Sequence, residues 1–172
     1  WQRGMALAAL TVAMLIPLAR FGPRYVELAA DNLAGRAHTW GDVAMDQESR
    51  AAAEIVRGIA HKSDTIFIWG YRPNVIVYTR LPVASWLWDS QPLTGVPADR
   101  HLSNATPVAP EWAQENRRQL IQTSPVFMVD GLSAYNPQLD IYGYPDLADW
   151  LRRYCVVGRA GATAVYRLCA RP

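Results

Sequence analysis

The sequence lacks the short motifs by which many enzymes are recognised. It contains no glycine-rich phosphate loop, no HExxH helix, no CxxC pair and no G-x-S-x-G turn around a serine. Its three histidines, His38, His61 and His101, lie far apart, and their spacing is not that of metal ligands. We therefore predict no catalytic residue, no metal site and no cofactor within this chain.

An excess of one charge is also missing. The 17 basic and 15 acidic residues leave a formal net charge of only +2, and they are spread along the chain. Nucleic-acid-binding domains usually carry a clustered basic face, so we predict no nucleic-acid partner. Hydrophobic residues make up 51% of the sequence and charged residues 19%, which excludes a disordered tail and favours one folded domain.

Charge is absent altogether from Met5–Ala19, an apolar segment between Arg3 and Arg20. As a helix it would extend about 22 Å, which is short of the roughly 30 Å hydrocarbon core of a bilayer. Three interpretations are open: the end of the last membrane span, a signal-like segment, or a buried helix. We favour the first, because a helix without a polar face is a poor surface helix. Since the chain begins with Trp rather than Met, we expect it to be a fragment or processed product of a longer protein.

The remaining residues alternate between strand-like and helix-like patterns. We predict the end of a transmembrane helix over residues 1–22, a connector with a short helix over 23–45, and an extracytoplasmic α/β domain over 46–172. Within that domain we expect helices at 46–61, 73–78, 111–122 and 146–154, and strands at 65–69, 84–88, 126–129, 154–159 and 164–169. Strand–helix alternation predicts a mostly parallel, Rossmann-like three-layer sheet with a C-terminal β-hairpin.

The only two cysteines, Cys155 and Cys169, lie in the predicted hairpin. If Ala160 faces Ala164 across a three-residue turn, Cys155 faces Cys169 at a Cα separation within disulfide range. A bridge there would indicate a compartment outside the cytoplasm, where disulfides persist. The alternative is a pair of buried free thiols, which is a common state for cysteine.

The most unusual segment is Trp69-Gly70-Tyr71-Arg72-Pro73, which leaves a predicted strand. Aromatic rings can stack on sugars and arginine can pair with phosphate, so Trp69, Tyr71 and Arg72 are candidate substrate-binding residues. The alternative is that Trp69 belongs to the core and Arg72 pairs with a neighbouring carboxylate. Five carboxylates at strand ends or in loops are either ligand-binding or turn-forming residues: Asp64, Asp89, Asp99, Asp130 and Asp140.

Residues 64–101 resemble bacterial members of the dolichyl-phosphate-mannose protein mannosyltransferase-like family, which are GT-C membrane glycosyltransferases. The resemblance rests on the strand entering WGYRP, on Tyr78, on Leu81-Pro82 and on DSQPLTG. The preceding apolar helix and the later PVFMVD strand agree with it. Many members have an arginine where Trp86 follows Ala84-Ser85, so a shared role of that position is not implied.

The resemblance implies a polytopic parent protein in the cytoplasmic membrane that uses a polyprenyl-phosphate-linked sugar donor. The catalytic acid of such enzymes lies in an early loop, upstream of this chain. Residues after about 22 would lie outside the cytoplasm, with the bilayer as a partner and the lipid-linked sugar and acceptor bound through the upstream region. The alternative is a free-standing, membrane-anchored α/β binding or scaffold module without catalysis.

Overall fold

The computed structural model describes residues 2–36, 40–97 and 105–169. The chain divides into two compact units, Trp1–Val43 and Ala44–Pro172. This division falls close to the predicted end of the connector, at residue 45.

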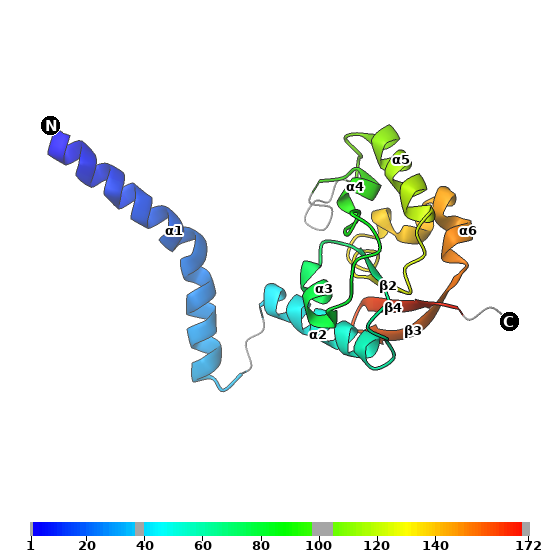
Figure 1. The fold of residues 1–172 in the computed structure, drawn as a ribbon. Coiled ribbons are helices and arrows are strands. Elements are labelled where there is room, and N and C mark those ends of the chain that lie inside the picture. The colour runs from blue at the N-terminus through cyan, green and yellow to red at the C-terminus, as the bar shows by residue number, and fades with distance from the viewer. Residues whose placement is uncertain (1, 37–39, 98–104, 170–172) are drawn as a thin grey trace. The chain divides into compact units, whose positions relative to one another are not determined.

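The first unit is built around one long helix, α1, over Gln2–Leu33 (Figure 1). It contains Pro17 and Pro23, and the ribbon bends in its middle, as proline causes in helices. The predicted break between an apolar helix and a short helix in the connector is therefore wrong, because the helix continues through both prolines. Gly4–Leu33 is long and apolar enough to cross a membrane, and none of its most apolar window is buried. A long apolar helix without buried residues near the N-terminus is found both in membrane spans and in signal sequences.

The second unit contains the remaining elements. Its larger helices are α2 (Gly41–Arg57), α3 (Pro73–Thr79) and α5 (Pro110–Ile121). Its strands are β1 (Ile66–Trp69), β2 (Phe127–Asp130), β3 (Tyr154–Ala160) and β4 (Thr163–Leu168). Two short α-helices are α4 (Gln91–Thr94) and α6 (Ala148–Leu151), and three 3₁₀ turns are η1 (Pro137–Leu139), η2 (Ile141–Gly143) and η3 (Pro145–Leu147). The predicted strands at TIFIW and VFMV, the helices that start at Pro73 and Pro110, and the terminal hairpin are confirmed.

Three predicted elements differ. Helix α2 begins at Gly41, so Asp46 is not its N-cap; Tyr78, Arg50 and Asn74 donate hydrogen bonds to Asp46 and lower its pKa to about 2. No strand forms at 84–88, and the chain makes only an isolated bridge just before it, between Val83 and Ile66. The predicted helix at 146–154 is reduced to η3 and α6, because Tyr154 already belongs to β3.

The four strands form one mixed sheet in the order β1-β2-β4-β3. Strands β1 and β2 are parallel, whereas β4 is antiparallel to both β2 and β3. The prediction of a mostly parallel sheet is therefore wrong. The sheet is mixed because the hairpin supplies two of its four strands, and the two strands of a hairpin must run in opposite directions.

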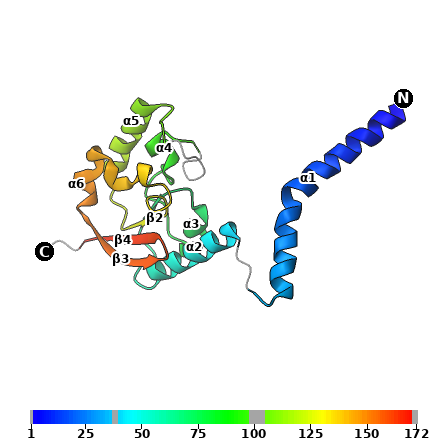
Figure 2. The same cartoon turned by 180° about the vertical axis from the view of Figure 1, so that it is seen from behind.

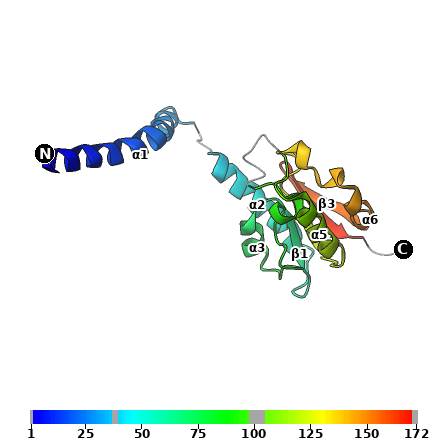
Figure 3. The ribbon, with the colours of Figure 1, turned by 90° about the horizontal axis from the view of Figure 1, so that it is seen from above.

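Helices cover both faces of this sheet (Figures 1 and 2). Side chains alternate along β1: Ile66 and Ile68 pack with Ala52 and Val56 of α2 and with Val75 of α3. On the other face lies a second cluster that includes Phe67, Trp69 and Met128 from the strands, Leu120 of α5 and Trp150 of α6. In Figure 1, α5 and α6 lie above the strands and α2 lies below them, and Figure 3 shows the same elements from above. Period-two alternation thus gives β1 and β2 two buried faces, whereas the edge strand β3 is largely exposed.

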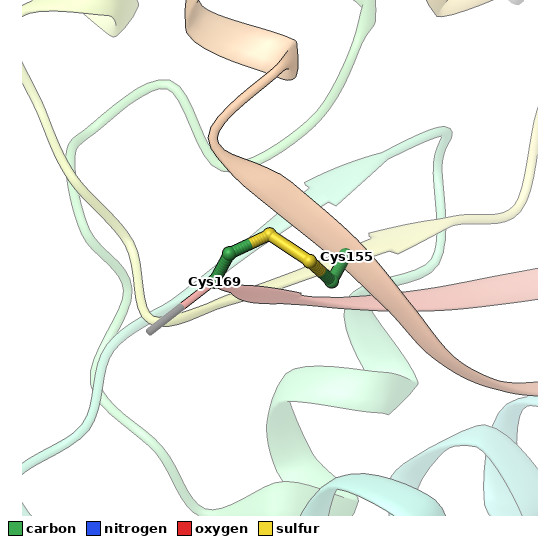
Figure 4. The surroundings of a disulfide bond; sticks show 2 residues. All are labelled: Cys155 and Cys169. Atoms are coloured by element: carbon green, nitrogen blue, oxygen red, sulfur yellow. A yellow bond between two sulfur atoms is a disulfide. The ribbon is translucent and has the colours of Figure 1, made fainter. Parts of the chain in front are cut away.

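Cys155 and Cys169 are joined by a disulfide with a Cα–Cα distance of 5.4 Å (Figure 4). The predicted register is nevertheless wrong. Ala160 pairs with Thr163, so the turn has two residues, and an extra residue at Val157 makes a bulge in β3. Each one-residue shift alone would move the cysteines to opposite faces, but together they place both on one face as diagonal neighbours. Cys155 is exposed, which excludes the alternative of two buried thiols.

Candidate functional site

Trp69 ends β1 in the interior of the domain. Its side chain is fully buried, its indole N–H donates to the Leu139 carbonyl oxygen at 3.0 Å, and its ring lies against those of Phe67 and Tyr144. A ring in this position cannot stack on a sugar. Trp69 is a core residue, as the alternative interpretation of the WGYRP segment states.

Arg72 is also buried, with 1% of its surface exposed. Both of its terminal nitrogens lie 3.4 Å from Glu48 Oε2, and Nη1 also lies 3.4 Å from Ser49 Oγ. Its guanidinium lies 5.2 Å from the centre of the Tyr135 ring. The structure places Arg72 beside a neighbouring carboxylate, with no open surface for a phosphate. Of the three candidate residues, only Tyr71 is exposed, and its ring lies 6.0 Å from that of Trp88.

Glu48 of α2 connects this arginine to the hairpin. Its carboxylate accepts hydrogen bonds from the Tyr135 hydroxyl at 2.7 Å and from Thr163 Oγ1 at 3.1 Å. Burial opposes the ionised form, but these hydrogen bonds and the Arg72 charge together lower the pKa of Glu48. The side chains of Glu48, Arg72, Tyr135 and Thr163 thus tie α2 to the carboxyl ends of β1 and β2, which makes them structural residues.

The candidate carboxylates separate into two groups. Asp64 accepts the His61 backbone N–H at 2.8 Å, and Asp89 accepts that of Gln91 at 2.9 Å, so both stabilise turns. Burial raises the pKa of Asp89. Asp99 lies outside the described residues. Asp130 and Asp140, by contrast, line one hollow at the carboxyl end of β2, where ligands bind in open α/β sheets.

This hollow, called here the strand-end pocket, has a volume of about 300 Å³. Segments that are distant in sequence line it: Asp130, Ser133, Ala134, Asp140, Tyr142, Arg159, Ala162, Ala164 and Tyr166. Its floor is a row of paired residues across three strands, because Asp130 of β2 and Arg159 of β3 both pair with Ala164 of β4. The small Ala164 side chain therefore leaves room between a carboxylate and a guanidinium.

The pocket carries hydrogen-bonding groups of several kinds. Asp130 is 6% exposed and its Oδ1 accepts the backbone N–H groups of Leu132 and Ser133, both at 3.0 Å. The Tyr166 hydroxyl is hydrogen-bonded to Tyr142, and burial raises the pKa of Tyr166, so this phenol remains a neutral donor. Carboxylate acceptors, phenols and one arginine suit binding of a small polar molecule. Among the described residues that line the pocket, no hydrogen bond joins a nucleophile to a base, and the Ser133 hydroxyl accepts from the Ile141 backbone N–H.

Two further hollows lie between α2 and α3. They share Arg57 and Arg80, and their volumes are about 330 and 550 Å³. The larger hollow is also lined by His61 and Lys62. Both helices end here, and cations at helix C-termini offset the partial negative charge of the helix dipole. We therefore interpret this basic groove as helix capping rather than as an anion site.

Sequence reasoning identified Asp130 and Asp140 but missed Glu48, Tyr142, Arg159 and Tyr166. No local signal marks these four residues. Strand pairing places Arg159 and Tyr166, and the packing of α2 and η2 against the sheet places Glu48 and Tyr142. Among the described residues, no group of three or more His, Cys, Asp or Glu side chains could hold a metal ion. Comparison of the chain with protein-family models, with curated proteins and with solved structures found no match.

Proposed function

We propose that this chain is the C-terminal extracytoplasmic domain of a polytopic membrane glycosyltransferase. The parent enzyme uses a polyprenyl-phosphate-linked sugar donor, and its catalytic part lies upstream of residue 1. The observation that carries the proposal is the succession of an unburied apolar helix, α1, and an α/β unit with an exposed disulfide. The family resemblance of residues 64–101 supplies the reaction class.

The charge pattern of α1 supports a membrane position for its first half. Met5–Ala19 carries no charge, whereas Arg20, Arg24, Glu27 and Asp31 all lie in its second half. At 1.5 Å per residue the whole helix is about 48 Å long, which exceeds the roughly 30 Å hydrocarbon core. The helix can therefore cross the bilayer and still extend into water.

The disulfide supports the proposal that the α/β unit lies on the extracytoplasmic side of the membrane. Cytoplasmic thiols are kept reduced, whereas disulfides persist in the bacterial periplasm and outside the cell. Cys155 is exposed on the hairpin, so a cytoplasmic reductant would reach it. We therefore propose that residues after about 22 lie on the extracytoplasmic side.

The strand-end pocket favours the second candidate function, a membrane-anchored binding or scaffold module. The upstream gene sequence separates the two. Several further apolar spans and an acidic residue in an early loop would support the glycosyltransferase, and a start codon just before Trp1 would support the free-standing module. Under both candidates, the purified 172-residue chain is expected to transfer no sugar from a panel of polyprenyl-phosphate donors.

Topology is tested in cells on the protein expressed from its natural gene. Alkaline phosphatase, which is active only outside the cytoplasm, is fused after the last residue of the chain, and a green fluorescent protein that matures only in the cytoplasm is fused in a parallel strain. We expect phosphatase activity without fluorescence. Fluorescence without phosphatase activity would overturn the extracytoplasmic assignment, and sugar transfer by the purified chain would overturn the upstream location of catalysis.

A further inference from the structure

The strand-end pocket combines a nearly buried carboxylate with an open floor. Asp130 uses only Oδ1 for the hydrogen bonds that it accepts from Leu132 and Ser133. Within the described part of the chain, Oδ2 makes no hydrogen bond, although the residue is only 6% exposed and lines the pocket. Because Asp130 lines the pocket, this oxygen can accept a hydrogen bond from a ligand hydroxyl there.

The other polar groups surround the same space. Asp140 uses Oδ1 for the Tyr142 backbone N–H at 3.0 Å, and Arg159 stands on the opposite side of Ala164 from Asp130. Neighbouring strands lie about 4.8 Å apart, so β2 and β3 are separated by about 10 Å. A hollow of about 300 Å³ is large enough for one six-membered ring with its hydroxyls, and acceptors and a donor line it.

Two tyrosines add an aromatic wall. Tyr166 is only 4% exposed, and its hydroxyl is hydrogen-bonded to Tyr142. Tyr142 is 57% exposed, and the centres of the two rings lie 6.5 Å apart. An exposed ring beside a polar pocket offers a stacking surface for the C–H face of a sugar, while phenols and carboxylates bond its hydroxyls.

The charges select against anions. Asp130 and Asp140 outnumber the single cation, Arg159, among the residues that line the pocket. A phosphate or carboxylate ligand would meet two like charges at close range, which disfavours its binding. A neutral ligand with several hydroxyls can use all three groups without that cost.

From this geometry we infer that the strand-end pocket binds one neutral hexopyranose unit, with Asp130 and Asp140 accepting from its hydroxyls, Arg159 donating and Tyr142 stacking. The inference deepens the proposed function, on which it rests only for the biological source of the sugar. Binding itself is tested without any transfer reaction or membrane topology.

The test is saturation-transfer NMR on the full 172-residue chain in micelles of a detergent without a sugar head group. The probes are methyl α-D-mannopyranoside, methyl β-D-glucopyranoside and methyl β-D-galactopyranoside, with 2-(hydroxymethyl)tetrahydropyran as a probe that lacks the ring hydroxyls. We expect saturation transfer to at least one glycoside and none to the tetrahydropyran. Absence of transfer to every glycoside, or equal transfer to the tetrahydropyran, would overturn the inference.

Variants locate the binding. Asp130→Asn keeps an Oδ1 acceptor for Leu132 and Ser133 but removes the charge, and Ala164→Val fills the floor with a residue that suits a strand. Each is expected to weaken glycoside binding at least about tenfold, the effect of one charged hydrogen bond. Tyr142→Ala should also weaken it, whereas Trp112→Ala, which removes an equally exposed ring from α5, should not.

Two further outcomes are decisive. Loss of binding in Tyr71→Ala, with Asp130→Asn and Tyr142→Ala unaffected, would place the sugar at the WGYRP segment and overturn the inference. Displacement of the glycoside by millimolar Ca²⁺ without any effect of Ala164→Val would show a cation site instead. Circular dichroism of each variant shows that it is folded, and if Ala164→Val does not fold, Tyr142→Ala provides the same test from an exposed position. The result is independent of the fusion experiment, so either proposal can fail alone.

Discussion

The guanidinium of Arg72 fills the space that a side chain at residue 131 would need. A Cβ atom built on Gly131 would lie 2.5 Å from Arg72 Nε and 2.7 Å from its Cδ. The loop after β2 therefore packs its backbone directly on a buried arginine. This contact joins the WGYRP segment after β1 to the neighbouring strand end, and it explains why residue 131 is glycine.

Gly131→Ala is expected to destabilise the domain by about 1–3 kcal/mol, because a methyl group would overpack a site occupied by a buried side chain. Denaturant unfolding followed by circular dichroism measures the change. Gly143→Ala is the matched control, since a Cβ there meets no atom within 4 Å. Equal stability of the Gly131→Ala and Gly143→Ala proteins would contradict the contact.

Arg72→Ala is expected to cost about 3 kcal/mol of unfolding free energy, because it leaves the Glu48 carboxylate without its cation and opens a cavity. This expectation reverses the one that a substrate-binding role of Arg72 would give, namely normal stability with reduced activity. Arg118→Ala removes a surface arginine that pairs with Glu115 and should change stability little. Normal melting of Arg72→Ala would restore the substrate-binding interpretation.

The lowered pKa of Glu48 predicts a pH dependence of stability. Because the folded-state pKa lies below the ordinary value of 4.5, the folded state binds fewer protons than the unfolded state over this range. The contribution is fully present above about pH 4.5 and is lost as the pH falls through the folded-state pKa. Unfolding free energies between pH 7 and pH 3 should therefore fall less steeply for Glu48→Gln than for the original protein, and parallel curves would contradict the prediction.

The disulfide predicts that no free thiol remains. Intact-mass analysis after alkylation of the unreduced, denatured protein, purified from an oxidising compartment, should find no label, and reduction before alkylation should add two. Cys155→Ser with Cys169→Ser is expected to cost about 3 kcal/mol, since the bridge closes a loop between residues 14 positions apart in the sequence. Two labelled thiols in the unreduced sample would remove the bridge and its support for the extracytoplasmic side.

The unburied apolar surface of α1 predicts that the full chain needs detergent to remain monomeric. A version that starts near Tyr25, without the uncharged half of the helix, should remain monomeric in buffer. Size-exclusion chromatography with light scattering measures both masses. A monomeric full chain in buffer alone would show that Met5–Ala19 is covered in some other way than by a membrane.

Local patterns in the sequence determined most of the elements. The apolar runs before Gly70 and Asp130 became β1 and β2, and prolines at 73 and 110 began α3 and α5. Each signal depends on neighbours within one or two turns: burial of a short β-branched run, or the fixed φ of proline at the first helical position. The uncharged segment of α1 is of the same kind, since length and composition alone make it a candidate span.

Tertiary structure alone decided strand order, hairpin register and the use of the strand-end residues. Sequence alternation could not show that β4 inserts beside β2, or that a two-residue turn and a bulge at Val157 would place Cys169 diagonally from Cys155. It could not show that Trp69 and Arg72 would be covered while Asp130 keeps an oxygen at an open pocket. These properties depend on pairing between segments far apart in the chain, and the free energy of that pairing comes from side chains that no local window contains.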